Sequence, residues 1–212
     1  MAPQAQTEAE RRFSGTVASP GLVAGRLVSL SPAAAPTQVL SATGSPDEER
    51  VRLEKAVAGA VVELNALLET IEDDEAAGIV AFQVAMLEDE SFLEPVLDGI
   101  AAGRSASAAW SRAMGSAIAD YAGAEDDYFR ARAADLADIR ERVADRLAGV
   151  VHRDIPPASI VVADELSPTR FLANDWRDSG IALARGSTAG HVAILARARG
   201  VPMLVGLGRL PQ

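Results

Sequence analysis

The sequence contains no cysteine, and aromatic residues make up only 4% of its 212 positions. Without thiols it can form neither disulfides nor cysteine-based metal sites, and this composition fits a cytoplasmic protein. Few aromatic residues and abundant alanine favour helices that pack through small side chains. The apolar share of 49% predicts a globular rather than a disordered chain.

Lysine and long apolar runs are also scarce. Lys55 is the only lysine and falls within an expected helix, so the sequence gives no support to Schiff-base chemistry. No apolar run reaches the length of a membrane span. The formal net charge of −10 argues against binding to nucleic acid or an anionic membrane, and it suits a basic protein partner. The length allows one large or two small domains.

The middle of the chain has the periodicity of helices. A first long helix begins at Ser45, with Pro46 in its first turn and Glu48 in the capping-box position. A second helical stretch covers roughly 76–102, a third starts at Ser105, and a fourth covers about 126–147. The residues expected to face inward include Val57, Leu64, Leu68, Ile79, Phe82, Met86, Val96, Ile100, Trp110, Met114, Leu136, Ile139 and Val143.

Strand patterns stand on both sides of this helical block. Residues 13–19 and 22–30 form two short apolar runs around the Pro20-Gly21 turn. Residues 159–163, 180–184 and 201–205 form three more. The simplest explanation is a helical domain inserted into an α/β domain.

One histidine lies between the last two of these strands. The segment 185–191 forms a turn rich in glycine and hydroxyl residues, and His191 then starts a short helix with Ile194, Leu195 and Ala198 on one side. Unpaired N–H groups at a helix N-terminus attract anions, phosphate above all, and disfavour a charged imidazole. A neutral imidazole facing an anion site suits a histidine that accepts a phosphoryl group. The local pattern alone favours a histidine that only caps the helix, because a single His after a glycine-rich turn is a modest signal.

Other chemistries have less support. His152, the only other histidine, stands near the expected domain boundary and is interpreted as a solvated or hinge residue. Neither histidine has a second ligand at metal-binding spacing, so no metal site is predicted in this chain. The turn before His191 has neither the GxGxxG pattern nor a P-loop lysine.

Several blocks together resemble the phosphoenolpyruvate-utilising enzymes, and Enzyme I of the sugar phosphotransferase system most of all. The stretch 185–206 resembles their phosphohistidine motif, with its His, Ala-Arg, Gly-Val-Pro and Val-Gly. The other blocks occur in family order and span nearly the whole chain. They are Ala18-Ser19-Pro20-Gly21, Met86-Leu87-Glu88-Asp89-Glu90, the segment 126–139 with Asp126-Asp127-Tyr128-Phe129, and Val162-Ala163-Asp164-Glu165-Leu166-Ser167-Pro168.

This resemblance implies an α/β phosphohistidine (swivelling) domain with an inserted all-α helical-bundle domain. Residues 1–12 would form a disordered tail. Residues 13–32 plus 150–212 would form the discontinuous α/β domain, truncated at its C-terminus. Residues 45–148 would form the inserted domain, which binds the phosphocarrier protein HPr.

The resemblance also implies a phosphoenolpyruvate-protein phosphotransferase of sugar transport. His191 would be the phosphohistidine nucleophile, Thr188 an orienting hydroxyl and Arg197 a group that balances phosphate charge. Cleavage of phosphoenolpyruvate would need the family's C-terminal barrel, which binds Mg²⁺, dimerises and is absent here. This chain alone would exchange a phosphoryl group with HPr.

The HPr contacts implied by the resemblance fall on the helical block. They are Glu75, Glu90, Phe92 and Arg132, with Phe92 expected to be an exposed apolar side chain beside carboxylates. Met86 and Leu87 could equally belong to the core.

The sequence departs from the family pattern at three places. Ala189-Gly190 stands where the family has Thr-Ser or Thr-Cys before the histidine, so Thr188 would approach the ring at a different angle. A family threonine that bonds the histidine falls on Phe171, and a family lysine near the partner site falls on Ala76. Two alternatives therefore stay open. One is the phosphohistidine domain of a multiphosphoryl or dihydroxyacetone-kinase-type transfer protein or of a dikinase, and the other is a non-catalytic HPr-binding module.

Overall fold

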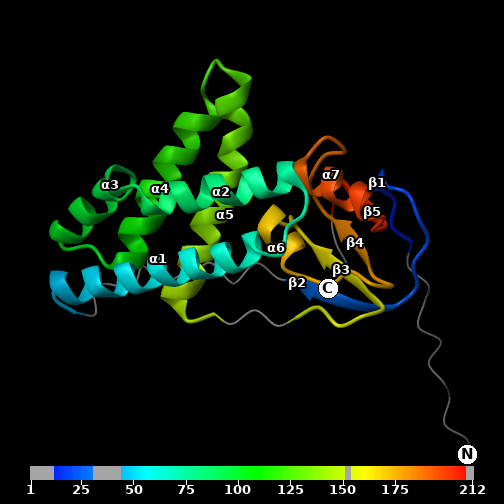
Figure 1. Cartoon of the computed structure of the whole chain (residues 1–212), viewed down its shortest axis with the longest axis horizontal. Helices are drawn as coiled ribbons and strands as arrows, with labels where there is room; N and C mark the ends of the chain where they lie inside the picture. The colour runs from blue at the N-terminus through cyan, green and yellow to red at the C-terminus, as the bar shows by residue number, and fades with distance from the viewer. Residues whose placement is uncertain (1–11, 31–43, 151–153, 209–212) are drawn as a thin grey trace, which may run out of the picture.

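A computed structural model describes residues 12–30, 44–150 and 154–208. Figure 1 shows a bundle of helices beside a smaller sheet with two short helices. The expected tail 1–12 lies outside the described residues except for Arg12, and so does His152. The proposed division into domains stays a prediction, although helices α1 to α5 all lie between strands β2 and β3 in chain order.

Helix α1 (Pro46–Leu68) begins where the sequence predicts. The Ser45 hydroxyl accepts a hydrogen bond from the amide of Glu48 at 3.4 Å, and the Glu48 carboxylate accepts one from the amide of Ser45 at 2.7 Å. This capping box satisfies two amides that the helix itself leaves unpaired. Its face with Leu53, Val57 and Leu64 is buried in the bundle.

The second helical stretch is two helices rather than one. Helix α2 (Asp74–Glu88) and helix α3 (Glu90–Ala101) meet at Asp89, whose extended backbone ends the first and starts the second. The Asp89 carboxylate accepts hydrogen bonds from the amide of Ser91 at 2.9 Å and from its hydroxyl at 2.7 Å. These bonds lower the pKa of Asp89 and stabilise the new N-terminus.

Helices α4 (Ala106–Ala122) and α5 (Asp127–Ala148) complete the bundle. The predicted N-cap is confirmed, because the Ser105 hydroxyl accepts a hydrogen bond from the amide of Ala108 at 3.2 Å. Trp110 is fully buried, and its indole N–H donates to the carbonyl of Arg140 at 3.0 Å. The core includes the predicted residues Met114, Leu136, Ile139 and Val143.

The sheet contains five strands in the order β1-β5-β4-β3-β2. They are β1 (Thr16–Ser19), β2 (Arg26–Leu30), β3 (Ser159–Ala163), β4 (Gly180–Leu183) and β5 (Met203–Val205). Strands β2, β3, β4 and β5 run parallel to one another. Strand β1 pairs with β5 in the antiparallel direction. The two N-terminal strands, neighbours in sequence, therefore lie at opposite edges of the sheet.

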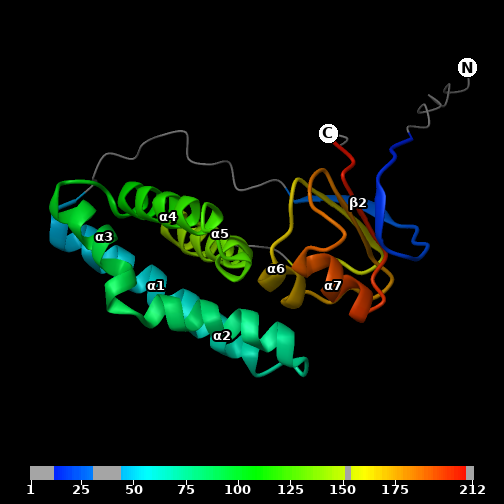
Figure 2. The same cartoon turned by 90° about the horizontal axis from the view of Figure 1, so that it is seen from above.

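The two short helices lie beside each other between the bundle and the sheet. Helix α6 (Pro168–Leu172) contacts α1, α2 and α5 on one side and α7 (His191–Ala198) on the other. Figure 2, seen from above, shows α6 as the element that joins the two parts. The placement of α7 is thus fixed partly by the bundle.

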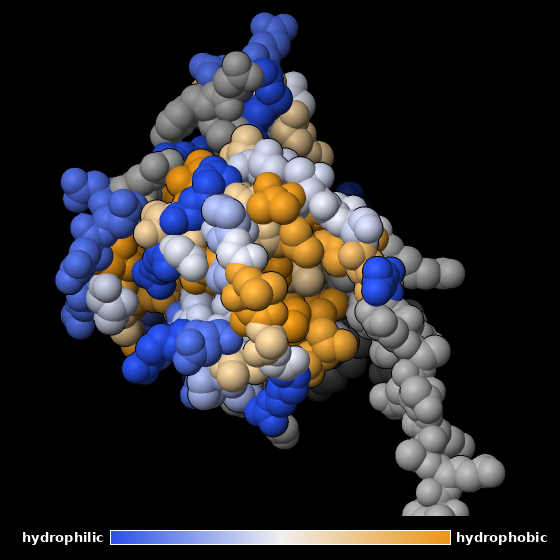
Figure 3. Space-filling view, turned by 90° about the vertical axis from the view of Figure 1, so that its right-hand side faces the viewer, coloured by the Kyte–Doolittle hydropathy of each residue, from blue (hydrophilic) through white to orange (hydrophobic). Residues whose placement is uncertain are grey.

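Part of the sheet leaves apolar side chains in solvent. The pairing of Val17 with Leu204 and of Leu27 with Ile160 shows that each edge strand places an apolar side chain beside one from its neighbour. Val17 is 59% exposed and Leu27 is 61% exposed. Figure 3, viewed from this end of the molecule, shows a cluster of apolar surface. Within the described part of the chain, no helix is long and apolar enough to cross a membrane.

Candidate functional site

His191 is the first residue of α7, as the sequence predicts. Strand β4 leads into a turn that contains Gly186, whose φ of +110° L-residues rarely adopt, and Gly190 is the N-cap of the helix. Gly190 has no side chain to cap this N-terminus, and among the described residues no hydroxyl or carboxylate takes its place. The His191 side chain is 27% exposed. An accessible imidazole therefore stands at a helix end that favours anions.

The buried side of α7 differs from the prediction. Val192, Ala193, Leu195 and Ala196 are buried, whereas Ile194 is half-buried and Ala198 is exposed. The helix is only two turns long, and it packs against both the sheet and α6. The buried face of α7 is therefore wider than that of a helix with one apolar side. It is also rotated about the helix axis from the face that the sequence predicts.

Helix α5 brings two charged residues to the histidine. The Nδ1 atom of His191 lies 3.8 Å from Oδ1 of Asp135, whose side chain is fully buried. The other carboxylate oxygen of Asp135 accepts a hydrogen bond from Arg132 at 3.0 Å. Arg132 also places its guanidinium 4.6 Å from the centre of the Phe82 ring. The helical part thus supplies a carboxylate to the imidazole of the α/β part.

Burial raises the pKa of Asp135, because its charged form loses water. The hydrogen bond from Arg132 and the nearby His191 oppose this rise, whereas the negative charge of Asp138 adds to it. Oδ1 of Asp135 is buried and has no hydrogen-bond partner among the residues that the structure describes. The oxygen of Asp135 that faces His191 is therefore Oδ1, the one that can still accept a hydrogen bond.

Thr188 and Arg197 are joined to each other through the backbone. Nη1 of Arg197 donates to the carbonyl of Thr188 at 2.9 Å and to the carbonyl of Ala18 at 2.8 Å. Thr188 lies in the exposed turn three residues before His191. The geometry gives Arg197 a role in fixing this turn, and the roles assigned to both residues on a bound phosphate stay predictions.

The expected partner contacts do not form one cluster with the histidine. Arg132 lies beside Asp135, whereas Glu90 and Phe92 belong to α3, at the end of the bundle far from α7 in Figures 1 and 2. The expectation that Phe92 is exposed is wrong, since it is half-buried against the core. Glu75 belongs to α2, but its side chain lies outside the described residues.

Two of the positions that depart from the family pattern, Phe171 and Ala76, are apolar and buried, whereas Ala189 in the turn before His191 is exposed. Phe171 is fully buried and stacks on Trp176 with ring centres 5.2 Å apart. Ala76 is also fully buried. Neither side chain offers a polar atom to His191, so Asp135 is the side chain whose charge faces its ring.

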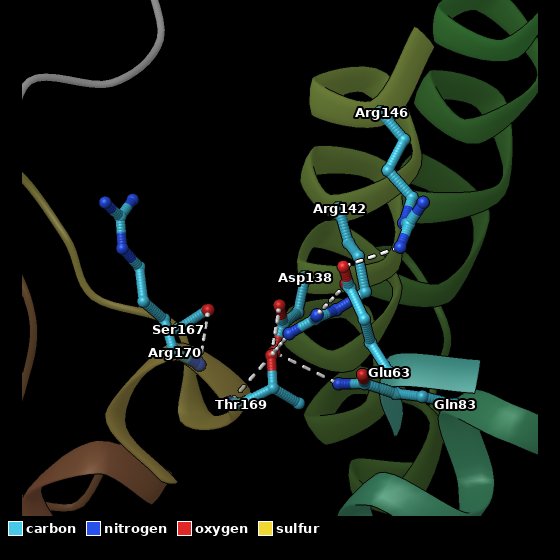
Figure 4. A network of polar contacts seen from close by, with 8 residues as sticks. All are labelled: Glu63, Gln83, Asp138, Arg142, Arg146, Ser167, Thr169 and Arg170. Carbon is cyan, nitrogen blue, oxygen red and sulfur yellow. Dashed lines mark hydrogen bonds and ion pairs between the residues drawn. The ribbon is translucent and has the colours of Figure 1, made fainter. Parts of the chain in front are cut away.

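A second polar cluster joins α6 to the bundle, as Figure 4 shows. The Thr169 hydroxyl donates to the Asp138 carboxylate at 2.7 Å and accepts from Nη2 of Arg142 at 2.6 Å. Asp138 also accepts from the Thr169 amide at 3.2 Å and from Gln83 at 3.1 Å. Arg142 in turn pairs with Glu63 at 3.0 Å. The buried bonds to Asp138 tie α6 and α2 to α5, and the exposed Arg142–Glu63 pair links α5 to α1.

A cleft of about 800 Å³ opens next to this cluster, between α1, α5 and α6. It is lined by Arg142, Arg146 and Arg170 and by a larger number of carboxylates, and His191 is not part of its wall. Because carboxylates outnumber arginines in this lining, the cleft is not suited to bind an anion. We therefore assign the functional site to His191 and not to this cleft.

Sequence reasoning missed Asp135, Asp138 and Thr169. Arg132 and Asp135 stand three residues apart on one helix, which is a visible signal for an ion pair. The approach of Asp135 to His191, 56 positions later in the chain, has no local signal. Within the described ranges, no group of three His, Cys, Asp or Glu side chains is placed to hold a metal ion.

Comparison with known proteins gives two family matches that together span most of the chain. Residues 14–132 match the family described as PEP-utilising enzyme, N-terminal. Residues 155–212, which contain His191, match the family described as PEP-utilising enzyme, mobile domain.

The similar curated proteins are considerably longer than this chain. The phosphoenolpyruvate-protein phosphotransferase of Streptomyces coelicolor is 32% identical over 173 residues, which is 78% of this chain and 31% of that protein. The enzyme of the same name from Haemophilus influenzae is 28% identical, over 94% of this chain and 36% of its own length. A multiphosphoryl transfer protein of Escherichia coli O157:H7 is 28% identical over 76% of this chain and 20% of its own. The chain therefore spans about a third or less of these relatives.

Two solved structures share the fold. The solution structure of Enzyme I (nEIt) superposes with a TM-score of 0.70 at 22% identity, covering 93% of this chain and 84% of that one. The N-terminal domain of Enzyme 1 - Nitrogen gives a TM-score of 0.68 at 24% identity, with coverage of 94% and 85%. The fold class expected from the sequence is confirmed.

Proposed function

The chain belongs to the PEP-utilising enzyme family, and from that premise we propose that His191 carries a phosphoryl group and exchanges it with a small phosphocarrier protein of the HPr type. The observation that carries the proposal is the position of His191. Its ring is accessible at an uncapped helix N-terminus inside the segment matched to the mobile domain. Such a terminus favours the negative charge of an incoming phosphoryl group.

The reaction is an in-line displacement at phosphorus. A ring nitrogen of His191 attacks the phosphorus atom while the bond to the donor's nitrogen breaks, and charge spreads over the three equatorial oxygens. Amides of the first turn of α7 would face that charge. Arg197 holds the carbonyl of Thr188 and so fixes the turn before the nucleophile, and its positive charge stays beside that turn.

The partner's docking surface would lie on the helical bundle. We expect the contacts to come from Arg132 on α5, from Glu90 and Phe92 on α3, and from Glu75 on α2. A chain with a net charge of −10 suits a basic partner. A half-buried Phe92 would contribute a smaller apolar contact than an exposed one.

Cleavage of phosphoenolpyruvate is proposed only for a longer protein. The chain spans about a third of the phosphoenolpyruvate-protein phosphotransferases that it resembles. Among the described residues, no group of three His, Cys, Asp or Glu side chains is placed to hold a metal ion. No step proposed for this chain involves Mg²⁺. The family's C-terminal barrel would supply phosphoenolpyruvate binding, the Mg²⁺ site and dimerisation.

A second candidate is a domain of a multiphosphoryl transfer protein. It is favoured by the similarity to the Escherichia coli protein of that name. The chemistry at His191 would be the same, and the donor or acceptor would be a covalently linked domain rather than a free phosphocarrier.

The experiment is incubation of the whole chain with radiolabelled phospho-HPr. We expect acid-labile label on the wild type and on His152→Gln, the matched control at the only other histidine. We expect at least a hundredfold less label on His191→Gln, because removal of the nucleophile abolishes this step. Equal labelling of His191→Gln and the wild type, or no label on either, would favour a binding module without transfer.

A further inference from the structure

We propose that Asp135 is the positioning residue for His191: it holds the imidazole proton on Nδ1, leaves Nε2 free to attack phosphorus, and offsets the charge of the phosphorylated ring. This inference rests on the proposed function of His191. It concerns a residue on the helical insert, which thereby takes part in the chemistry of the α/β part as well as in partner binding.

The first support is geometric. Nδ1 of His191 and Oδ1 of Asp135 are 3.8 Å apart, just beyond hydrogen-bond distance. In resting enzymes such contacts are often long and shorten in the reacting complex. The ring atom that approaches the carboxylate is Nδ1, so Nε2 is the nitrogen left for the partner.

The second support is the unused capacity of the carboxylate. Asp135 is fully buried, and Arg132 binds only its Oδ2 atom. Oδ1 has no hydrogen-bond partner among residues 12–30, 44–150 and 154–208. A buried oxygen without a donor is costly, and the Nδ1–H group of His191 is the donor that its position suits.

The surroundings leave few other candidates for this role. The groups that face the pair are Arg132 and Asp138 on α5 and the Phe82 ring on α2. Asp138 is already bound by Thr169 and Gln83. The charge that acts on the imidazole therefore comes from Asp135, and Arg132 holds that carboxylate in place.

In this arrangement, every bond, electron pair and proton of the transfer step is accounted for. The lone pair of Nε2 forms the new N–P bond, and the electron pair of the breaking bond returns to the donor's imidazole. That donor ring, protonated on its other nitrogen, leaves as neutral imidazole. The proton on Nδ1 of His191 stays in place, and the ring becomes a phosphorylated imidazolium whose positive charge faces the Asp135 carboxylate.

The first measurement determines the tautomer of His191 independently of phosphoryl transfer. Nitrogen-15 NMR of the unphosphorylated chain reports which ring nitrogen of His191 carries the proton. We expect mainly the Nδ1–H form in the wild type, in Asp135→Asn, whose amide oxygen can still accept, and in the control Asp145→Asn. Asp145 is a buried carboxylate ten residues further along α5, about 15 Å away. We expect the Nε2–H form to become the major one in Asp135→Ala.

The second readout is the rate of phosphoryl uptake from phospho-HPr. We expect a loss of about tenfold to a hundredfold in Asp135→Ala, a smaller loss in Asp135→Asn, and none in Asp145→Asn. A wild type in the Nε2–H form, or an Asp135→Ala variant with an unchanged tautomer and rate, would overturn the proposal. A wild type that takes up no phosphoryl group would instead refute the function of His191, while the NMR of that same protein still decides the role of Asp135.

Discussion

Thr169→Val tests whether the buried polar cluster holds α6, and with it α7, against the helical bundle. Valine has nearly the shape of threonine, so the change removes the hydroxyl and little else. Thr169 is fully buried and Asp138 is 4% exposed, so water cannot readily replace the lost contacts. The substitution tests hydrogen bonding rather than packing.

The magnitude follows from the two bonds that disappear. One joins the hydroxyl to the Asp138 carboxylate at 2.7 Å, and the other joins it to Arg142 at 2.6 Å. A bond to a charged group contributes about 1.5–3 kcal/mol, and Asp138 keeps its bonds from Gln83 and from the backbone amide. We expect the free energy of unfolding to fall by about 3 kcal/mol. For a chain of this size that lowers Tm by about 6–12 °C.

Urea and thermal unfolding followed by circular dichroism measure this change. Thr169→Ser keeps the hydroxyl but loses the methyl group, so it should be destabilised less than Thr169→Val if the hydrogen bonds are what hold α6. If Thr169→Val unfolds within about 0.5 kcal/mol of the wild type, a range typical of substitutions that touch no such feature, the cluster does not join the two parts as described.

Three further substitutions, with Gly78→Ala as a control for one of them, test the pKa of Asp135, the turn before His191 and the first helix. Burial raises the pKa of Asp135, so this carboxyl favours folding below the usual Asp range, and that contribution is lost as pH rises through its raised pKa. Asp135→Asn should therefore match the wild type in the free energy of unfolding near pH 3.5 and exceed it at pH 7.5, and a gain confined to acid pH would contradict this sign. Gly186→Ala, at a φ of +110°, should lower the free energy of unfolding by about 1–2 kcal/mol, whereas Gly78→Ala, in a helix with open space around it, should raise it by about 0.5–1 kcal/mol. Ser45→Ala should cost about 1 kcal/mol in urea unfolding, since it breaks the bond to the Glu48 amide, and no change would mean that this cap is replaced by water without loss.

The features that the sequence predicts well are those with local causes. The capping box at Ser45, the N-cap at Ser105 and the start of α7 at His191 depend on residues within one helical turn. Strand pairing depends on contacts far apart in the chain. The partners of β1 and β2 therefore could not be read from the Pro20-Gly21 turn, and these strands lie at opposite edges of the sheet.

The same distinction applies to the functional site. His191 is recognisable from its own turn and helix, and its resemblance to the phosphohistidine motif adds the expected chemistry. Asp135 and Thr169 could not be assigned roles, because each acts through a residue on another element, His191 and Asp138 respectively. The prediction that Phe92 is exposed is wrong, because the carboxylates beside it in the sequence do not reveal how α3 packs on the bundle.

The central claim is that the imidazole of His191 receives a phosphoryl group at an anion-favouring helix end. The most direct measurement is to locate acid-labile phosphate by mass spectrometry, with a fragmentation method that retains it, after the chain is incubated with phospho-HPr. We expect one phosphoryl group per chain, placed on His191. Phosphate on another residue, or none on a chain that nevertheless binds phospho-HPr, would contradict the claim.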